Sequence, residues 1–369
     1  MKKKEIITVI ITTLILAALI GGCLFLASRH RFESKNDPTV FSYFTEHKTL
    51  MEYNALTESV RKVCGHSTPN DECPLENVIS KVQVYENKVY FNRMIGYVRA
   101  ISCCDPKTSE VFDITDVKNE VFYDLGDNFA VGDGYVFYNE DGNIFRVPVS
   151  GGESRLIHKM QDDLEQVIAV ADGKLFTATY SNPFSSTSSY TKQIFAYDLK
   201  SFKKREIYSF VSPIMSSSNN NYQYYNGYLY MMLTPEIRDG NQIYGKTNLY
   251  RINTKTERVE RILDTEIANF VVSNNKIYYF PYEERTVITP SVTYDVRIGD
   301  SIWTCSTDGK NSRVVYTNPD IIFEDCRIVG EKFFGFCSGS CPEIGINGGQ
   351  FYCTIDFNTQ NIKKIAMPD

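Results

Sequence analysis

Histidine and tryptophan are scarce in this sequence. Its 369 residues contain one tryptophan, Trp303, and four histidines, which are His30, His47, His66 and His158. A His-Glu-x-x-His metal motif is missing, and so is a glycine-rich loop that could hold a phosphate ahead of a helix. We therefore expect no catalytic residues, no metal and no cofactor, and we favour a binding protein over an enzyme.

Clustered positive charge is also missing. The chain carries 39 lysines and arginines against 45 acidic residues, a net charge of −6, and its basic residues are dispersed. Binding to nucleic acid depends on a concentrated positive field that neutralises phosphates. Nucleic acid is therefore excluded as the main partner.

Long apolar runs are absent after residue 27, but one precedes it. Residues 6–27 read IITVIITTLILAALIGGCLFLA, without a charge. As a helix rising about 1.5 Å per residue, this run spans roughly 33 Å, enough for a hydrocarbon core of about 30 Å. We expect residues 1–5 to be cytoplasmic, residues 6–27 to form a single transmembrane anchor, and the rest to lie outside the cytoplasm.

Two features of this segment leave alternatives open. Basic residues stand on both sides of the run, so its orientation rests on the large domain after it. The stretch LIGGC resembles a bacterial lipobox, so a cleaved lipoprotein anchored at Cys23 is the alternative to an uncleaved anchor.

Nine cysteines follow the apolar run, and an odd number leaves at least one thiol free or paired between chains. Cys64 and Cys73 flank a polar loop, and Cys337 and Cys341 flank SGS, so each pair could form a disulfide. Alternatively, these cysteines are small buried residues. Cys337 also lies in a G-x-C-x-G pattern, but the strand-to-helix turn and histidine of a nucleophile elbow are missing. We expect it to be structural.

The chain between the apolar run and residue 82 differs in pattern from residues 82–369. Residues 28–40 are polar and predict a linker. In residues 41–80, Tyr53, Leu56, Val60 and Val63 recur at helical spacing. This spacing predicts one short amphipathic helix in an otherwise irregular segment.

From residue 82 onward the sequence repeats a strand–turn–strand unit. The strand after the first turn shares an aromatic residue, at Tyr90, Phe137, Phe176, Tyr230, Tyr278 and Phe334. A second motif follows each unit and aligns Trp303 with Phe145, Phe195, Tyr250 and Tyr352, so Trp303 is expected to be a packing residue rather than part of a site. A period of about 40–55 residues with four strands per unit is typical of a β-propeller. We expect an all-β propeller over residues 82–369.

Six blades are expected, at residues 82–113, 127–157, 167–209, 221–263, 268–316 and 325–366. A seventh blade drawn partly from residues 41–80 is the alternative. The motifs IWTCSTDGKNSRVV and IFRVPVSGGESRLI resemble the six-bladed YWTD propellers of the low-density-lipoprotein-receptor type. They resemble more closely a bacterial extracytoplasmic propeller family of unknown function. The resemblance implies the fold; the YWTD tetrad itself is missing, and no functional residue is carried over.

Loop length suggests where function lies. Connections between the second and third strands of blades 3 to 6 are long, at residues 181–192, 234–247, 281–300 and 338–349, and emerge on one face. Long loops are costly to order and often functional. Tyrosine and arginine dominate binding energetics, and this face carries Tyr190, Arg238, Tyr244, Tyr282, Arg285, Tyr294 and Arg297.

These loops predict an extracytoplasmic binding or scaffold module for a protein, peptide or glycan. One alternative is a hydrolase or lyase with carboxylates and tyrosines at the propeller axis. A structural subunit of an envelope complex is another.

Overall fold

The computed structural model describes residues 41–64, 73–78, 82–95, 98–117, 129–140, 142–159, 164–180, 190–212, 222–239, 242–288 and 293–368. The expected anchor at residues 6–27, with Cys23, and the linker at 28–40 lie outside these ranges. Within the ranges, helix occurs only as two short 3-10 turns, η1 (Pro74–Glu76) and η2 (Pro342–Ile344), and no helix is long and apolar enough to cross a bilayer.

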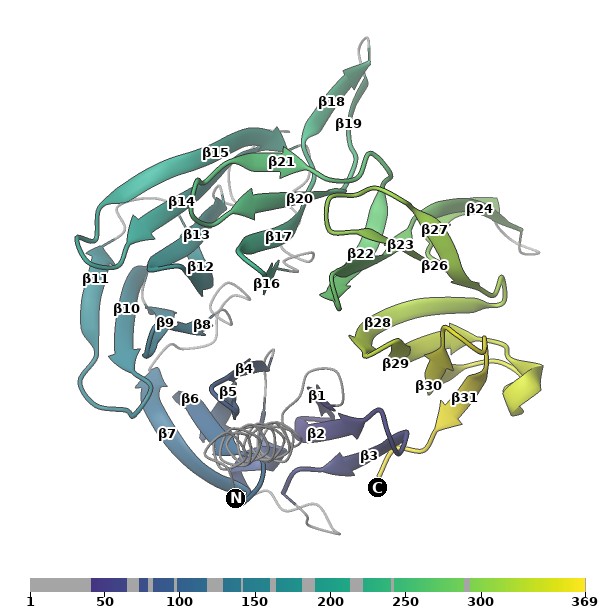
Figure 1. Cartoon of the computed structure of the whole chain (residues 1–369), viewed down its shortest axis with the longest axis horizontal. Coiled ribbons are helices and arrows are strands. Elements are labelled where there is room, and N and C mark those ends of the chain that lie inside the picture. Colours follow the sequence, from purple (N-terminus) through teal and green to yellow (C-terminus); the bar gives the residue numbers. More distant parts are fainter. Residues whose placement is uncertain are drawn as a thin grey trace, which may run out of the picture.

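The described residues form a β-propeller of seven blades arranged around a central axis (Figure 1). The first three blades contain β1 (Phe41–Glu46), β2 (Thr49–Asn54) and β3 (Ser59–Lys62); β4 (Gln83–Tyr85), β5 (Lys88–Ile95), β6 (Val98–Asp105) and β7 (Glu110–Val117); and β8 (Phe129–Gly132), β9 (Tyr135–Glu140), β10 (Asn143–Pro148) and β11 (Arg155–Lys159). The fourth and fifth contain β12 (Leu164–Ala171), β13 (Lys174–Tyr180), β14 (Tyr190–Asp198) and β15 (Lys204–Ser212); and β16 (Tyr222–Tyr225), β17 (Tyr228–Leu233), β20 (Asn248–Asn253) and β21 (Val259–Arg261). The last two contain β22 (Ile267–Ser273), β23 (Lys276–Pro281), β26 (Ser301–Ser306) and β27 (Arg313–Thr317); and β28 (Ile321–Val329), β29 (Lys332–Gly339), β30 (Gln350–Asp356) and β31 (Ile362–Ile365).

The expectation of six blades is wrong, and the alternative of a seventh blade from residues 41–80 is confirmed, because residues 41–62 supply it. β1, β2 and β3 form a three-stranded antiparallel sheet that fills the gap between the second and seventh blades (Figure 1). The blades numbered 3 to 6 in the six-blade count are therefore the fourth to seventh blades of the ring. The ring also departs from the six-bladed architecture that the YWTD resemblance implied.

The amphipathic helix expected within residues 41–80 is also not formed where its four marker residues lie. Tyr53 lies on β2 and Val60 on β3, where their backbones pair across an antiparallel ladder. Leu56 lies in the turn between these strands, and Val63 follows β3. A three- or four-residue spacing that spans a turn mimics the helical period. Tyr53 and Val60 pack in one junction cluster, whereas Leu56 is exposed and Val63 packs at another junction.

Seven hydrophobic clusters hold the ring together, one at each junction between adjacent blades. The aromatic residues that recur after the first turn are all buried, with exposed fractions of 0–2% at Tyr90, Phe137, Phe176, Tyr230, Tyr278 and Phe334. Trp303 is half-buried in the cluster between the fifth and sixth blades, together with Cys305. Trp303 is therefore a packing residue, as its alignment with the other repeats predicted.

Candidate functional site

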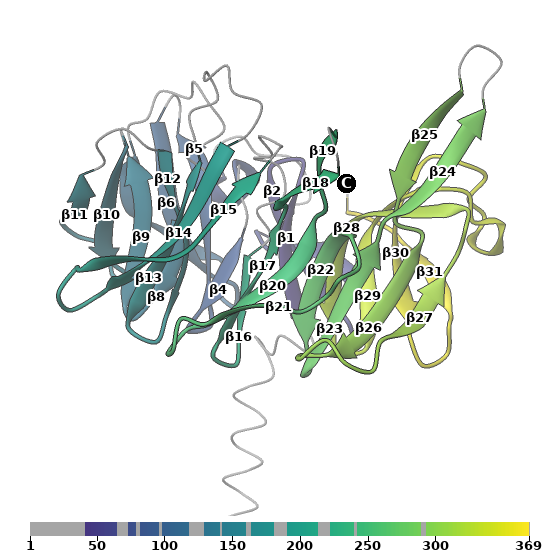
Figure 2. The same cartoon turned by 90° about the horizontal axis from the view of Figure 1, so that it is seen from above.

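Two of the four long connections fold into β-hairpins that project from the ring. β18 (Glu236–Asp239) and β19 (Gln242–Gly245) lie between β17 and β20, and β24 (Glu283–Ile288) and β25 (Thr293–Ile298) lie between β23 and β26. The β24–β25 hairpin rises above the ring in Figure 2, and the β18–β19 hairpin points away from it in Figure 1. We call these two hairpins the arms.

Local sequence explains why the second arm forms strands. β24 and β25 are rich in threonine, valine and isoleucine, and β-branched side chains suit a pleated ladder. Each arm is a two-stranded sheet, which is marginally stable in isolation. β18 contacts β15 of the fourth blade, so the first arm is supported by the blade that precedes its own.

The predicted binding residues divide between the two arms and their bases. Arg238 and Tyr244 are both exposed on the β18–β19 arm, and Arg238 donates a hydrogen bond to the Glu236 carboxylate. Tyr282 is half-buried at the base of the second arm, where its backbone N–H donates to the Glu266 carbonyl over 3.1 Å.

The remaining predicted binding residues are placed by their backbone. Arg285, Tyr294 and Arg297 occupy the β24–β25 ladder, opposite Val296, Val287 and Glu284 respectively. Tyr190 begins β14, and most of the connection before it lies outside the described residues. The structure thus places six of the seven residues on or beside two arms of adjacent blades, and the seventh on the blade before them.

The fourth long connection, residues 338–349, is compact. It contains η2, and the backbones of Cys341 and Ile346 exchange hydrogen bonds of 2.8 and 3.0 Å across that turn. This connection therefore adds no arm to the seventh blade.

A buried carboxylate network lies away from the arms, within the fourth blade. The Glu165 side chain is 2% exposed, and its carboxylate accepts hydrogen bonds from the Tyr197 hydroxyl at 2.8 Å and from Thr177. The Lys204 ammonium lies 2.6 Å from the same carboxylate and 3.8 Å from the centre of the Phe195 ring. A buried charge is tolerated when it is paired and hydrogen-bonded in this way.

A histidine of the third blade lies beside this network, at the junction between the third and fourth blades. The ring of His158, on β11, lies 5.4 Å from that of Tyr197. Burial lowers the pKa of His158, and burial raises the pKa of Tyr197, so both stay neutral near pH 7. The hydrogen bonds of the network therefore join the four strands of the fourth blade, and the His158 ring of the third blade packs against Tyr197.

The two disulfides suggested by cysteine spacing are not formed in the structure. Cys64, Cys73, Cys337 and Cys341 are free thiols, as are the other cysteines of the described residues. The Cys64 thiol donates to the Glu76 carboxylate at 3.3 Å, and Cys337 has its sulfur 3.5 Å from that of Cys353 rather than bonded to Cys341. Burial raises the pKa of Cys305 to about 12, so this thiol is held protonated.

Across the described ranges, no group of three or more His, Cys, Asp or Glu side chains is arranged to hold a metal ion. Gly335, Cys337 and Gly339 of the G-x-C-x-G pattern lie on β29, an interior strand of the seventh blade. Cys337 is fully buried there, which agrees with the structural role expected for it.

The sequence analysis missed a set of side-chain hydrogen bonds that joins neighbouring blades. Gln223 on β16 bridges to β22, where its amide donates to the Val272 carbonyl at 2.6 Å and accepts from the Val272 N–H at 2.7 Å. The Tyr225 hydroxyl accepts the Asn275 N–H at 2.9 Å. Similar bonds run to the third blade, where Gln83 donates to the Phe129 carbonyl and accepts from the Val131 N–H, and Tyr85 accepts a backbone N–H. The signal was a repeated Gln-x-Tyr that closes two first strands.

The sequence matches no protein-family model and no curated protein. Among solved structures, the β-propeller domain of the Trilobed protease from Pyrococcus furiosus is similar at 12% identity and a TM-score of 0.53, covering 89% of this chain and 94% of that one. Oligogalacturonate lyase from Vibrio parahaemolyticus is similar at 12% identity and a TM-score of 0.50, covering 88% and 84%. A chain of a nidogen/laminin complex is 9% identical with a TM-score of 0.44, covering 72% and 89%. The first two likenesses establish the β-propeller fold, and at these identities they assign no family.

Proposed function

We propose that this chain is a membrane-anchored extracytoplasmic binding module whose arms recognise a protein, peptide or glycan. The single observation that carries the proposal is that two long connections on one face form projecting β-hairpins. Ordering such segments costs conformational entropy, and the packed ring does not need them, because the second and third blades connect the same two strands by short turns.

The chemistry of the arms supports this proposal. Tyr244 and Arg238 are exposed on the first arm, and tyrosine and arginine combine a large contact area with polar ends. The outer strand edges of a hairpin can also pair with an extended peptide, a common mode of recognition. A peptide or protein segment that lies between the two arms is therefore the ligand class we favour.

The anchor and location belong to the same proposal. The uncharged run at residues 6–27 supports a single transmembrane span with the propeller outside the cytoplasm. The mass of the mature chain distinguishes this arrangement from a lipoprotein at Cys23. An uncleaved anchor retains residues 1–22, whereas a lipoprotein loses them and carries an acyl mass that Cys23→Ser removes.

A relationship to the bacterial extracytoplasmic propeller family, and more distantly to the YWTD propellers, is also proposed. It rests on motifs such as IWTCSTDGKNSRVV. The alternative of a hydrolase or lyase at the axis has weaker support. In the buried carboxylate–tyrosine pair described above, within the fourth blade, the Glu165 carboxylate is already paired with Lys204 and accepts a hydrogen bond from Tyr197.

The test is partner capture by the anchored, full-length protein in its native cells. Tyr282→Ala, Arg285→Ala and Tyr294→Ala are combined in one variant, and the captured partner is identified by mass spectrometry. Lys255→Gln, on an exposed turn at the opposite end of the blades, is the control. We expect the triple variant to lose a partner that the control retains. Equal capture by both variants would show that the arms do not bind the partner.

A further inference from the structure

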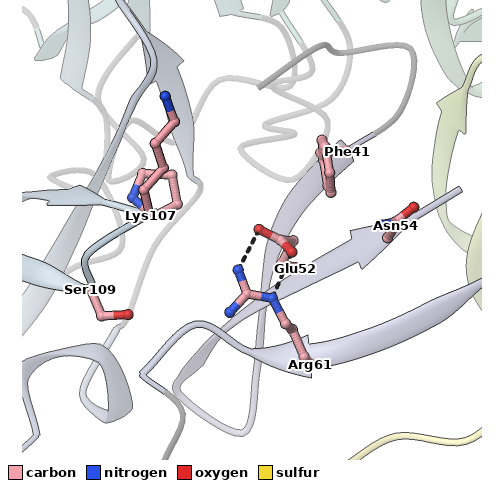
Figure 3. A pocket seen from close by; sticks show the side chains of 7 residues that line it. Phe41, Glu52, Asn54, Arg61, Lys107 and Ser109 are labelled. Atoms are coloured by element: carbon pink, nitrogen blue, oxygen red, sulfur yellow. Dashed lines mark hydrogen bonds and ion pairs between the residues drawn. The ribbon is translucent and has the colours of Figure 1, made fainter. Parts of the chain in front are cut away.

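A pocket lies between the first and second blades, at the opposite end of the blades from the arms. Its volume is about 370 Å³, and it is lined by Phe41, Glu52, Asn54, Arg61, Pro106, Lys107 and Ser109. In Figure 3, Arg61 and Glu52 point toward one another from the first blade, while Lys107 and Ser109 form the facing wall. Sites for small molecules range from about 300 to 1,000 Å³, so the pocket suits a small ligand.

The acidic group of this pocket is already occupied. Arg61 donates from Nε and Nη2 to the two carboxylate oxygens of Glu52, over 2.7 and 2.9 Å, and the Tyr43 hydroxyl donates to the same carboxylate over 3.1 Å. Glu52 is only 6% exposed. Its negative charge is therefore neutralised in place and is not available to a cation.

The basic groups, in contrast, retain free donors. Within the described part of the chain, the Lys107 ammonium has no acidic partner, and the third guanidinium nitrogen of Arg61, Nη1, has no acceptor. The Asn54 side-chain oxygen accepts two turn amides, at 2.9 and 3.3 Å, which leaves its amide nitrogen to donate. The pocket thus carries one positive charge in excess, several free donors and no free carboxylate.

The junction between the fifth and sixth blades shows why the pocket is open. There, Arg251 on the third strand pairs with Glu260 on the fourth at 2.9 Å, and its Nη1 donates across the junction to the Thr307 carbonyl at 2.7 Å. In the first blade the same two positions are exchanged, so Glu52 stands where Arg251 would and Arg61 where Glu260 would.

This exchange removes the bond that would cross the junction. A carboxylate cannot donate to the carbonyl of the facing turn, and the arginine now lies on the outer strand. The first two blades are joined beside the pocket by the Ser109 hydroxyl, which donates to the Val63 carbonyl at 2.6 Å. The exchange of acid and base therefore leaves an open pocket between the two blades, and free hydrogen-bond donors line this pocket.

We propose that this pocket binds a small monocarboxylate that bears an apolar group. Lys107 and Nη1 of Arg61 would donate charge-assisted hydrogen bonds to the carboxylate. The Phe41 ring and the buried Pro106 would contact the apolar group. A doubly charged phosphate suits the pocket less, because only one positive charge is in excess and Glu52 lies beside it.

Calorimetric titration of the purified full-length chain tests this assignment. The probes are phenylacetate, its uncharged isostere phenylacetamide, and inorganic phosphate. The variant is Lys107→Gln, which removes one charge from an exposed side chain. The matched control is Lys255→Gln, because both lysines follow the same kind of turn: their N–H groups donate to Asp105 at 2.9 Å and to Asn253 at 3.1 Å.

We expect phenylacetate to bind, phenylacetamide and phosphate to bind at least tenfold more weakly, and Lys107→Gln to weaken phenylacetate roughly tenfold while Lys255→Gln leaves it unchanged. Absence of phenylacetate binding would overturn the proposal. Equal binding of phosphate, or an equal loss in both lysine variants, would do the same. The outcome is independent of the arms, since none of these residues lies on them.

Discussion

The hydroxyl of Tyr53 lies 3.0 Å from that of Thr354, 301 residues further along the chain, and the Tyr53 ring stacks on Phe334 with centroids 4.0 Å apart. Thr354 has one hydroxyl hydrogen, which it donates to the Phe333 carbonyl at 2.8 Å. Tyr53 is therefore the donor in the Tyr53–Thr354 bond. Burial raises the pKa of Tyr53 to about 12, which keeps this donor protonated. The two ends of the described ring meet at this contact.

This contact predicts how the ring responds to loss of the Tyr53 side chain. Tyr53→Phe removes one buried hydrogen bond, and we expect it to lower the free energy of unfolding by about 1 kcal/mol. Tyr53→Ala also removes the stacked ring and leaves a cavity, at a cost of about 3–5 kcal/mol. Urea denaturation followed by circular dichroism measures both, with the exposed Tyr244→Phe as control. A Tyr53→Ala loss no larger than that of Tyr53→Phe would show that the first blade does not close the ring.

A charged clamp at the same junction predicts a pH dependence. The Glu58 carboxylate contacts the ammonium groups of Lys332 and, at 3.0 Å, Lys363 on the seventh blade. The hydrogen bond from Lys332, with that from Lys363, lowers the pKa of Glu58 below its ordinary value. A lowered carboxylate pKa adds stability above the unfolded value of about 4.3, and this stability is lost as pH falls through the folded value.

Glu58→Gln should therefore unfold more easily than the natural chain at pH 7. It should lose less further stability between about pH 5 and pH 3, because it has no carboxylate to protonate at this site. Urea midpoints at these pH values test both statements, and Glu153→Gln, at an exposed position, serves as control. Parallel pH profiles for Glu58→Gln and the natural chain would contradict the role assigned to the clamp.

The Glu165 network predicts a larger loss than a surface ion pair. Glu165→Gln leaves the Lys204 ammonium without its carboxylate, and breaking a fully buried pair costs about 3–5 kcal/mol. Lys204 is 29% exposed and can recover some hydration, so we expect about 2–3 kcal/mol. Thermal and urea unfolding check the value, and adding Lys204→Met should recover part of the loss. No recovery would mean that the charge pair is not the cause.

Gly335 gives a steric prediction. A Cβ atom there would lie 2.1 Å from the Asp325 carbonyl oxygen and 2.5 Å from the Phe333 ring. Gly335→Ala should therefore cost about 1–3 kcal/mol or more through overpacking. Gly299→Ala is the matched control, because its nearest contact would be an ordinary 3.5 Å. Equal stability of the two variants in urea would contradict the close packing of β28 on β29.

The repeated parts of the fold were predictable because each blade packs against its neighbours in the same way and therefore needs the same type of residue at the same position. Each blade needs a buried aromatic at the same place, so Phe137 and Tyr278 could be recognised as equivalent without a structure. The first blade was only the alternative prediction, because its copy of the repeat was not recognised among residues 41–80. Residues 49–63 read TLMEYNALTESVRKV and match NLYRINTKTERVERI at 248–262, down to turns in which Asn54 and Asn253 accept equivalent amides.

The candidate site was predictable only in outline. Loop length identified residues 234–247 and 281–300 as candidate binding segments. It did not show that they are hairpins, because their strands are too short for a clear apolar–polar alternation. The pocket of the first two blades depends on which strand carries the acid of an ion pair. Glu52 and Arg61 are charged residues like any others in the sequence, and only the register across β2 and β3 makes their exchange visible.

Binding through the arms can be observed by site-specific photo-crosslinking in intact cells. A photoreactive residue replaces Tyr244 or Tyr282 on the arm face, and Lys255 or Lys310 at the exposed turns of the opposite end. We expect one discrete partner to crosslink from Tyr244 and Tyr282 and not from the two lysine positions. Crosslinks from the lysine positions with none from Tyr244 or Tyr282 would contradict binding through the arms.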